Sequence, residues 1–458
     1  GAGAGAGARL SAPADRALAL SILSASGLAV PVSPVAAMTS ALPAPPAAKP
    51  AAKPTGAAPP PAGARLISRS EMASHDKEDD VWIAVKGKVY DCTKYLKDHP
   101  GGIDSITMNA GEDTTEEFEA IHSPKAWKAL EPWYIGELVE DDHPGLKGQA
   151  GPTKVPEAAP ELATGKITSA VALNPKKRVP LTLVRRDEIN DTVRLWRFQL
   201  PDPEMVLGLP CGKHFLVYAK VAEPAAAAED GATAAPEATT KALCVRAYTP
   251  VSADELKGHV DLLVRVYRPL PPRFPRGGIM SQHFDSLALG DTIEVRGPIG
   301  EIEYLGDGAF NHAHHGIFVA KTALFIGGGT GITPLYSVIR SALTLGYDGQ
   351  NTSLDKMSLV YGNSDTANIL CRKELDAWAV DYKQRFSLWY TIDQPPPAEE
   401  KWDYSVGFMD EKMISARAPT DTPGAADYAF LCGPPPMLAA VKRVLNKIGY
   451  ADDHIMCF

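Results

Sequence analysis

The sequence predicts a multidomain chain with a small α+β domain, an antiparallel β-barrel and an α/β domain built on a parallel sheet, in that order. Three observations predict this organisation. Residues 66–140 mix short strand-like runs with polar helical stretches, and residues 179–305 hold successive strand-like runs separated by turn residues. Residues 320–458 instead alternate strand and helix patterns, which is typical of a parallel α/β sheet.

The remaining stretches have the composition of linkers. Residues 1–65 are rich in Ala, Gly and Pro and carry few charges, so we expect a disordered head or hinge. Residues 141–178 read as a linker, and Ala222–Lys241 reads as a loop insertion within the barrel. Because the chain opens on Gly and its first methionine is Met38, we expect a piece of a longer protein.

The charge distribution and the placement of the cysteines limit the classes of binding partner and the cellular compartment. The net charge is -9, and residues 66–140 alone carry -8. This acidity argues against nucleic acid and suggests docking on a positive protein face, although a solvated acidic surface is an equal alternative. No apolar run approaches the roughly 18 residues of a membrane span. The six cysteines are scattered without a C-x-x-C pair, which fits a reducing compartment, so we expect a cytoplasmic protein.

Two histidines stand out in the acidic block. His99 begins an H-P-G-G turn after a predicted strand, and His122 follows a polar helical stretch. Either histidine alone is more often structural or surface-exposed than a ligand. The proline fixes the direction of the turn, however, and the glycines let the backbone approach a large flat ligand. The pair is therefore a more specific signal for a ligand site than either histidine alone.

The barrel region carries a candidate flavin site. Arg246, Ala247, Tyr248 and Thr249 lie on a predicted strand, where a cation beside an aromatic ring suits a flavin nucleotide. A strand arginine is more often simply exposed. Gly277–Ser281 adds a small-residue turn that opens a helix, whose first amides suit a phosphate.

The α/β region carries a candidate nicotinamide site. Gly327–Pro334 (GGGTGITP) follows a predicted strand and leads into a helix, which is an arrangement that receives a diphosphate. It does not match G-x-G-x-x-G, and a tight structural turn is the alternative. Cys432–Met437 (CGPPPM) ends the last strong strand. A small buried core thiol is the structural alternative for Cys432.

These motifs resemble known families. The segment around His99 and His122 resembles cytochrome b5 domains, and the other motifs resemble the cytochrome b5 reductase branch of the ferredoxin-reductase-like superfamily. Segments such as FPRGGIMSQHFDSL, GPIGEIEY and YSVGF extend the resemblance over residues 66–458 to the C-terminal part of eukaryotic assimilatory nitrate reductases, except for the insertion and Asn311–His315.

The resemblance implies roles for individual residues. His99 and His122 would be the heme iron ligands, and Cys432 and Thr249 would lie at the reacting rings. The residues implied for FAD are Arg246, Ala247, Tyr248, Thr249, Leu263, Val264, Arg265, Val266, Tyr267, Phe274, Ile279, Met280, Ser281 and Thr333. The residues implied for NAD(P)H are Gly328, Gly329, Thr330, Gly331, Cys432, Gly433, Pro434 and Met437.

The function implied is an electron relay. Hydride would pass from NAD(P)H to FAD, and single electrons would then pass to a bis-histidine heme b. NADH is the expected donor, with NADPH left open because Asn368 stands where NADH-preferring relatives carry an acidic residue. A molybdenum cofactor would belong only to a further N-terminal domain that reduces nitrate, and a homodimer is expected only for such a full-length protein. This chain alone would reduce ferricyanide or cytochrome c.

Two alternatives remain. The first is a stand-alone cytochrome b5–reductase fusion that reduces another acceptor, such as a desaturase or a ferric species. The second is an electron-carrier module with a degenerate reductase half.

Overall fold

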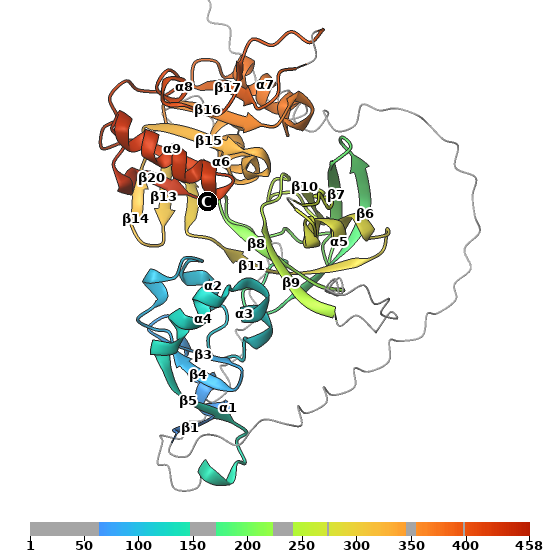
Figure 1. The fold of residues 1–458 in the computed structure, drawn as a ribbon, viewed down its shortest axis with the longest axis vertical. Coiled ribbons are helices and arrows are strands. Elements are labelled where there is room, and N and C mark those ends of the chain that lie inside the picture. Colours follow the sequence, from blue (N-terminus) through green and yellow to red (C-terminus); the bar gives the residue numbers. More distant parts are fainter. Residues whose placement is uncertain (1–63, 147–170, 223–240, 273, 345–353, 397–398) are drawn as a thin grey trace, which may run out of the picture. The chain divides into compact units, whose positions relative to one another are not determined.

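The computed structural model describes residues 64–146, 171–222, 241–272, 274–344, 354–396 and 399–458 (Figure 1). All of them fall within one compact unit, Ala58–Phe458. The expectations for the head, for most of the 141–178 linker and for the insertion therefore lie outside the described residues.

The acidic block forms a five-stranded sheet covered by short helices, the predicted α+β domain. The strand order is β1-β5-β4-β3-β2. Strand β3 is buried on both faces: Val81, Ile83 and Val85 join one core, and Trp82 and Ala84 join another. The elements are β1 Leu66–Ser68, α1 Arg69–Ala73, β2 Asp76–Lys77, β3 Asp80–Val85, β4 Lys88–Asp91, η1 Leu96–Asp98, α2 Ile103–Thr107, α3 Thr115–Ile121, α4 Pro124–Leu130, η2 Glu131–Trp133, β5 Tyr134–Val139 and η3 Pro144–Leu146.

The next segment forms a curled antiparallel sheet of six strands in the order β10-β7-β6-β11-β8-β9. Its core contains Trp196, Phe198 and Phe215, and Phe284 of helix α5 packs against Trp196 with ring centroids 5.6 Å apart. The predicted antiparallel architecture is confirmed. The elements are β6 Val179–Glu188, β7 Val193–Gln199, β8 His214–Ala222, β9 Lys241–Tyr248, β10 His259–Arg265, α5 Ile279–Ser286 and β11 Thr292–Ile299.

A small antiparallel sheet of β12 (Ile302–Gly306), β13 (Ala309–His312) and β14 (Gly316–Val319) follows. Residues 306–319 lie between the two predicted domains and were not predicted to form strands. Glycines and histidines interrupt the apolar alternation there, and one face of β14 is exposed, so the pattern of a half-buried strand is weak.

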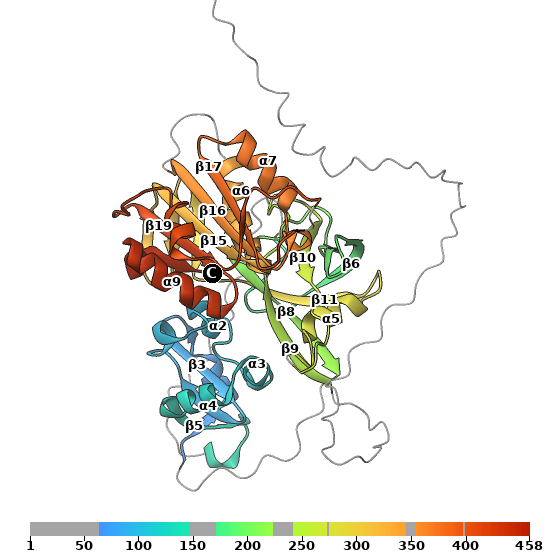
Figure 2. The ribbon, with the colours of Figure 1, turned by 45° about the horizontal axis from the view of Figure 1, so that its top comes forward.

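The last segment is a six-stranded parallel sheet in the order β18-β17-β16-β15-β19-β20, as predicted. Figure 2 shows its central strands with the helices around them. The elements are β15 Thr322–Gly328, η4 Gly329–Gly331, α6 Ile332–Thr344, β16 Lys356–Asn363, η5 Thr366–Asn368, α7 Arg372–Asp381, β17 Phe386–Ile392, β18 Ser405–Val406, α8 Glu411–Ser415, β19 Asp427–Cys432, α9 Pro435–Ile448, η6 Asp452–His454 and β20 Ile455–Cys457.

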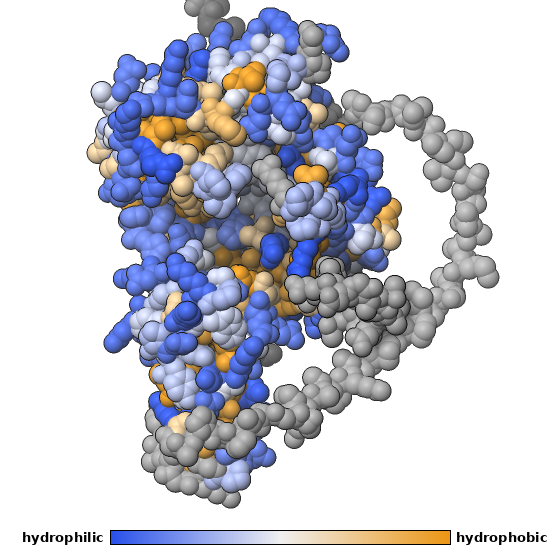
Figure 3. Space-filling view, viewed as in Figure 1, coloured by the Kyte–Doolittle hydropathy of each residue, from blue (hydrophilic) through white to orange (hydrophobic). Residues whose placement is uncertain are grey.

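Alternate residues of each central strand serve the two faces of this sheet. Ala323 and Phe325 of β15 pack with α6 and α7, whereas Leu324 and Ile326 pack with α8 and α9. The strands are therefore buried on both sides, which explains their continuous apolar runs. Hydrophilic side chains cover most of the visible surface, with hydrophobic ones in small groups (Figure 3).

Hydrogen bonds tie the curled sheet to the parallel-sheet segment. Arg340 of α6 donates to the carbonyl oxygens of Val251 (2.6 Å) and Ser252 (3.2 Å). On another side of the contact, Asn190 donates to the carbonyl of Ala367 (2.7 Å) and Arg265 donates to that of Asn368 (3.4 Å). These contacts fix the two walls of the site described next.

Candidate functional site

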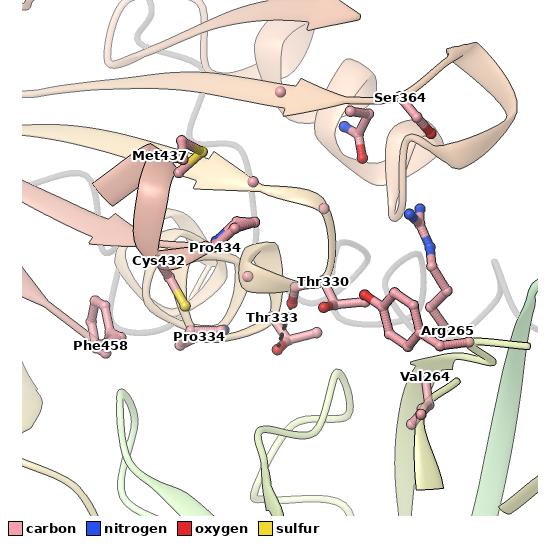
Figure 4. Close-up of a pocket in the computed structure, with 18 of the residues that line it drawn as sticks. Val264, Arg265, Thr330, Thr333, Pro334, Ser364, Cys432, Pro434, Met437 and Phe458 are labelled. Carbon is pink, nitrogen blue, oxygen red and sulfur yellow. Dashed lines mark hydrogen bonds between the residues drawn. The ribbon is translucent and has the colours of Figure 1, made fainter. Parts of the chain in front are cut away.

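A cleft of about 1530 Å³ is lined by residues of both the curled sheet and the parallel sheet. Figure 4 shows its lining, with Val264 and Arg265 from β10 and Cys432, Pro434 and Met437 from the β19–α9 side. Chain order reverses between β15 and β19, because β16, β17 and β18 lie on one side of β15 and β19 and β20 lie on the other. Ligands of open parallel sheets bind at the carboxyl ends of the strands where the order reverses.

The two glycine turns at this reversal pack against each other. A Cβ atom added to Gly331 would lie 2.5 Å from the carbonyl oxygen of Cys432, and one added to Gly433 would lie 3.2 Å from Gly328. Glycine is therefore required because two backbone segments meet here. Gly329 has φ +55° and no atom within 4 Å of an added Cβ, so space is open beside it. The arrangement leaves a bare-backbone cradle at the start of α6.

The opposite wall carries a second small-residue turn. Gly277 has φ +62°, and a Cβ there would lie 2.4 Å from the carbonyl oxygen of Tyr267. Gly278 is the N-cap of α5 without a side-chain cap, so the first amides of this eight-residue helix have no such partner. Ser281 accepts from the Tyr267 amide at 3.0 Å and fixes the turn. The turn and the helix start are suited to an anionic phosphate.

The charged side chains that line the described part of the cleft are Arg246, Arg265, Arg276 and Asp393. Three cations against one anion favour a diphosphate ligand. Arg246 is exposed and forms no ion pair among the described residues; its guanidinium donates to the carbonyl oxygen of Val245 at 2.7 Å. Asn363, at the carboxyl end of β16, is buried, and neither its amide oxygen nor its nitrogen has a hydrogen-bond partner in the described part of the chain. Such a buried group requires a partner, and a bound nucleotide would supply one.

Cys432 lies at the end of β19, beside Gly327 of β15 in the sheet register. The C-terminal residue Phe458 is next to it, because the Phe458 amide donates to the carbonyl of Leu431 at 2.9 Å. Burial, with a smaller contribution from Cys457, raises the pKa of the Cys432 thiol to about 12. The sulfur is therefore a neutral thiol at physiological pH, which suits a positioning contact and not a nucleophile.

The histidine pair forms a separate site in the first domain. The rings of His99 and His122 have centroids 5.9 Å apart. Nδ1 of His99 donates to the carbonyl of Gly102 (3.1 Å), and Nδ1 of His122 donates to that of Phe118 (3.2 Å). Because a carbonyl only accepts, each Nε2 keeps its lone pair for a metal. Desolvation lowers both histidine pKa values, which favours the neutral ligand form.

The spacing of this pair suits one metal ion between two imidazoles. Two metal–nitrogen bonds of about 2 Å each, plus the distance from each nitrogen to its ring centre, come to roughly 6 Å. Phe118 stacks on the His122 ring with centroids 4.1 Å apart, and Tyr95 meets the His99 ring edge-on at 5.8 Å. Aromatic walls of this kind suit a large flat macrocycle, so the residues present fit a heme.

Every predicted flavin or nicotinamide residue except Val266 lines the cleft. Val266 is buried in the core of the curled sheet, and its amide donates to the carbonyl of Thr192 at 2.7 Å. The structure therefore does not place Val266 in the cleft. The cleft is also lined by residues that were not among the expected site residues: Gly212, His214, Arg276, Gly362, Asn363, Ser364, Thr391, Asp393, Gly407, Phe408, Met409, Ala440, Val441 and Phe458.

Three domain families match the chain. Residues 68–139 match the cytochrome b5-like heme/steroid binding domain, residues 180–228 and 233–304 match the oxidoreductase FAD-binding domain, and residues 325–443 match the oxidoreductase NAD-binding domain. The crystal structure of the cytochrome b5 reductase domain of Ulva prolifera nitrate reductase is similar along its whole length, with 36% identity, a TM-score of 0.56 and 63% of this chain covered.

The chain belongs to the nitrate reductase family.

Curated nitrate reductases from plants are also similar to this chain. A Brassica napus nitrate reductase [NADH] is 43% identical over 394 residues, and a Hordeum vulgare nitrate reductase [NAD(P)H] is 42% identical over 392 residues. Each match covers 84% of this chain but only about two fifths of the relative. The chain is thus an NAD(P)H-dependent oxidoreductase with heme-, FAD- and NAD-binding domains, as expected. In the described residues, no helix has the length and hydropathy needed to cross a membrane.

Proposed function

We propose that this chain is the part of an assimilatory nitrate reductase that takes electrons from NAD(P)H and delivers them to heme. The observation that carries the proposal is the cleft shared by the two sheets, in which the glycine cradle of α6 faces the basic wall of the curled sheet. When bound, the cofactors supply hydride acceptance, its division into single electrons and one-electron transfer.

The chain's own residues would divide the cleft between two nucleotides. Arg246, Tyr248 and the turn at Gly277–Ser281 would hold the FAD, with the diphosphate on the arginine and the first amides of α5. The cradle at Gly328–Gly331 and the Cys432–Met437 turn would hold NAD(P)H. Cys432 would orient the nicotinamide as a neutral thiol, and His99 and His122 would bind heme iron through Nε2.

The wider assignments are proposals as well. We propose a head at 1–65, a heme domain at 66–140, a linker at 141–178, an FAD domain at 179–305 and a nicotinamide domain at 320–458. In the longer enzyme the heme would serve a molybdenum domain that reduces nitrate, and that enzyme would be a homodimer. NADH is the proposed donor, with NADPH as a second one. Six cysteines free of disulfides support a location in the reducing cytoplasm.

An absorption spectrum before and after addition of NADH, and then of NADPH, tests the proposal. FAD- and heme-loaded protein should bleach in the flavin band and develop the sharp bands of a reduced b-type heme within the same reaction. The same protein should reduce ferricyanide. If NADH and NADPH leave the flavin band unchanged, the proposed function is wrong.

A further inference from the structure

Helices α2 and α3, which flank the histidine pair, contact the curled sheet and its preceding segment through four cations. Lys176 donates to the carbonyl oxygens of Thr107 (3.1 Å) and Ala110 (3.2 Å), at the end of α2. Arg178 pairs with Glu117 of α3. The other two cations, Lys213 and Arg296, make the contacts that carry the inference.

Arg296 of β11 is a buried arginine, only 3% exposed, whose hydrogen bonds cross to the heme domain. Its Nη2 donates to the carbonyl of Met108, its Nη1 donates to the side-chain oxygen of Asn109 (2.9 Å), and its Nε donates to the carbonyl of Pro175 (2.8 Å). A buried guanidinium is costly unless its donors are satisfied. Two of these three acceptors belong to the heme domain, so the burial of Arg296 depends on that domain being in place.

Asp104 of α2 contacts two residues that lie close to the lining of the cleft. Its Oδ2 accepts from Nζ of Lys213 (3.2 Å) and from the Gly300 amide (3.3 Å). Lys213 precedes His214, which lines the cleft, and Gly300 follows Ile299, the partner of His214 in the sheet register. The Asp104 carboxylate therefore contacts the residue next to His214 and the residue that follows the strand partner of His214.

The histidine turn approaches the same place. A Cβ added to Gly102 would lie 3.1 Å from the side chain of Glu301, directly after Gly300. Gly102 also accepts the Nδ1 hydrogen of His99 through its carbonyl. A continuous protein path from the cleft to a proposed heme ligand thus runs through His214, Gly300 or Glu301, and the turn at Gly102.

We propose that this contact is the docking interface for electron transfer, with the chain's own heme domain as the partner and Arg296 as the positioning residue. The inference rests on the proposed function, because it assigns the contact to the step between flavin and heme. Electron-transfer rates fall steeply with distance. Loss of the docking interface should therefore slow heme reduction and leave the reduction of the flavin unchanged. Lys213 and Asp104 add an attraction that salt screens.

The docking interface is tested first by a cross-linking experiment that does not depend on electron transfer. A zero-length carbodiimide joins a carboxylate to an amine only when the two are in contact, so the full chain should yield an Asp104–Lys213 cross-linked peptide by mass spectrometry. The yield should fall at 0.5 M salt and in Arg296→Met. Absence of this peptide from the parent protein overturns the inference.

Stopped-flow reduction by NADH then tests its role. Asp104→Lys should slow heme reduction roughly ten-fold, the size expected when one partner of an interface charge pair is replaced. Flavin reduction and ferricyanide reduction should stay at parent rates. The double variant Asp104→Lys with Lys213→Glu restores the pair with reversed charges and should recover most of the rate. Glu204→Lys, which makes the same charge change at an exposed ion pair with Lys257, is the control and should be parent-like.

The outcomes separate the two proposals. If flavin is not reduced at all, the proposed function fails, while the cross-link still reports on the dock. If flavin is reduced and Asp104→Lys reduces heme at the parent rate, the docking inference fails alone. It also fails if the charge-reversed double variant is no faster than Asp104→Lys.

Discussion

The Cys432 thiol shows how burial decides the chemistry of one residue. Its pKa is raised from 9.0 to about 12, so at pH 8 it holds roughly a thousand-fold less thiolate than an unperturbed thiol. We expect iodoacetamide to label Cys432 at pH 8 far more slowly in the folded protein than in denaturant, as measured by peptide mass spectrometry. Equal labelling rates would contradict this. Because the folded-state pKa is the higher one, the associated stability is present below pH 9 and is lost as the pH rises towards 12.

Asp365 is the acidic residue that follows the second strand of the parallel sheet. Its carboxylate accepts from the Asn368 amide (3.0 Å), the Asn368 side chain (2.6 Å) and the Ser364 hydroxyl (3.0 Å), and Ser364 lines the cleft. By analogy with the acidic residue that binds the ribose 2′ hydroxyl in other dinucleotide sites, we predict that Asp365 faces the 2′ position of the bound nucleotide. The contacts hold the Asp365 carboxylate beside the neutral Asn368 side chain and next to the cleft residue Ser364.

Asp365→Asn removes that charge and keeps a good N-cap for η5. The ratio of kcat/KM for NADPH to that for NADH should rise roughly three- to ten-fold, for the loss of about 1 kcal/mol of repulsion with a 2′-phosphate. Ferricyanide reduction measures both donors, and Asp381→Asn, at the far end of α7, is a surface control. An unchanged ratio would show that Asp365 does not face the 2′ position.

At the scale of elements, the contact between the two glycine turns makes a sharp prediction. Gly331→Ala forces its new methyl group against the Cys432 backbone, which should cost about 1–3 kcal/mol of stability and raise KM for NADH. Gly290→Ala is the matched control. Gly290 has φ +96° but nothing within 4 Å of an added Cβ, so only the backbone cost of about 1 kcal/mol applies. Thermal unfolding and NADH titration compare the two, and an unchanged KM for Gly331→Ala would be the contrary result.

Elements with strong periodicity were predictable, and irregular ones were not. The strands ALFI and AFLC could be assigned because burial on both faces gives a continuous apolar run, and the turns after them follow from their glycines. Val266 was placed in the cleft with its neighbours, whereas the chain beyond β10 turns it into the core. His214 and Phe458 reach the cleft through strand pairing far along the chain, which no local pattern encodes.

At the scale of the whole molecule, the heme domain has hydrophobic cores separate from those of the reductase segments. His122→Ala should therefore abolish the reduced b-type heme spectrum and leave NADH–ferricyanide reduction within about two-fold of the parent, because only an iron ligand is lost. Absorption spectra and ferricyanide assays on the same sample provide the comparison. Loss of both activities would mean that the domains do not fold independently.

The acidic block was predicted to meet a positive protein face, and the structure places Asp104 and Glu117 against Lys213 and Arg178. The sequence could not identify Arg296. An arginine in a strand is usually exposed, and its acceptors are backbone and amide oxygens whose positions depend on how one domain packs on another. Interdomain contacts of this kind leave no periodic pattern in the sequence, so they cannot be predicted in the way that a helix or strand can.

One pairing in the heme domain has a consequence for its architecture. Strands β1 and β5 run parallel, with Leu66 opposite Glu137 and Ser68 opposite Val139. Leu66, where the chain enters the domain, thus lies roughly 8 Å from Val139, where it leaves, given a strand spacing of about 4.8 Å and a rise of about 3.3 Å per residue. Because its two ends lie close together, the heme domain is joined to the rest of the chain at one place on its surface. A domain with neighbouring ends can be inserted into a longer chain, or lost from it, without separating the domains on either side.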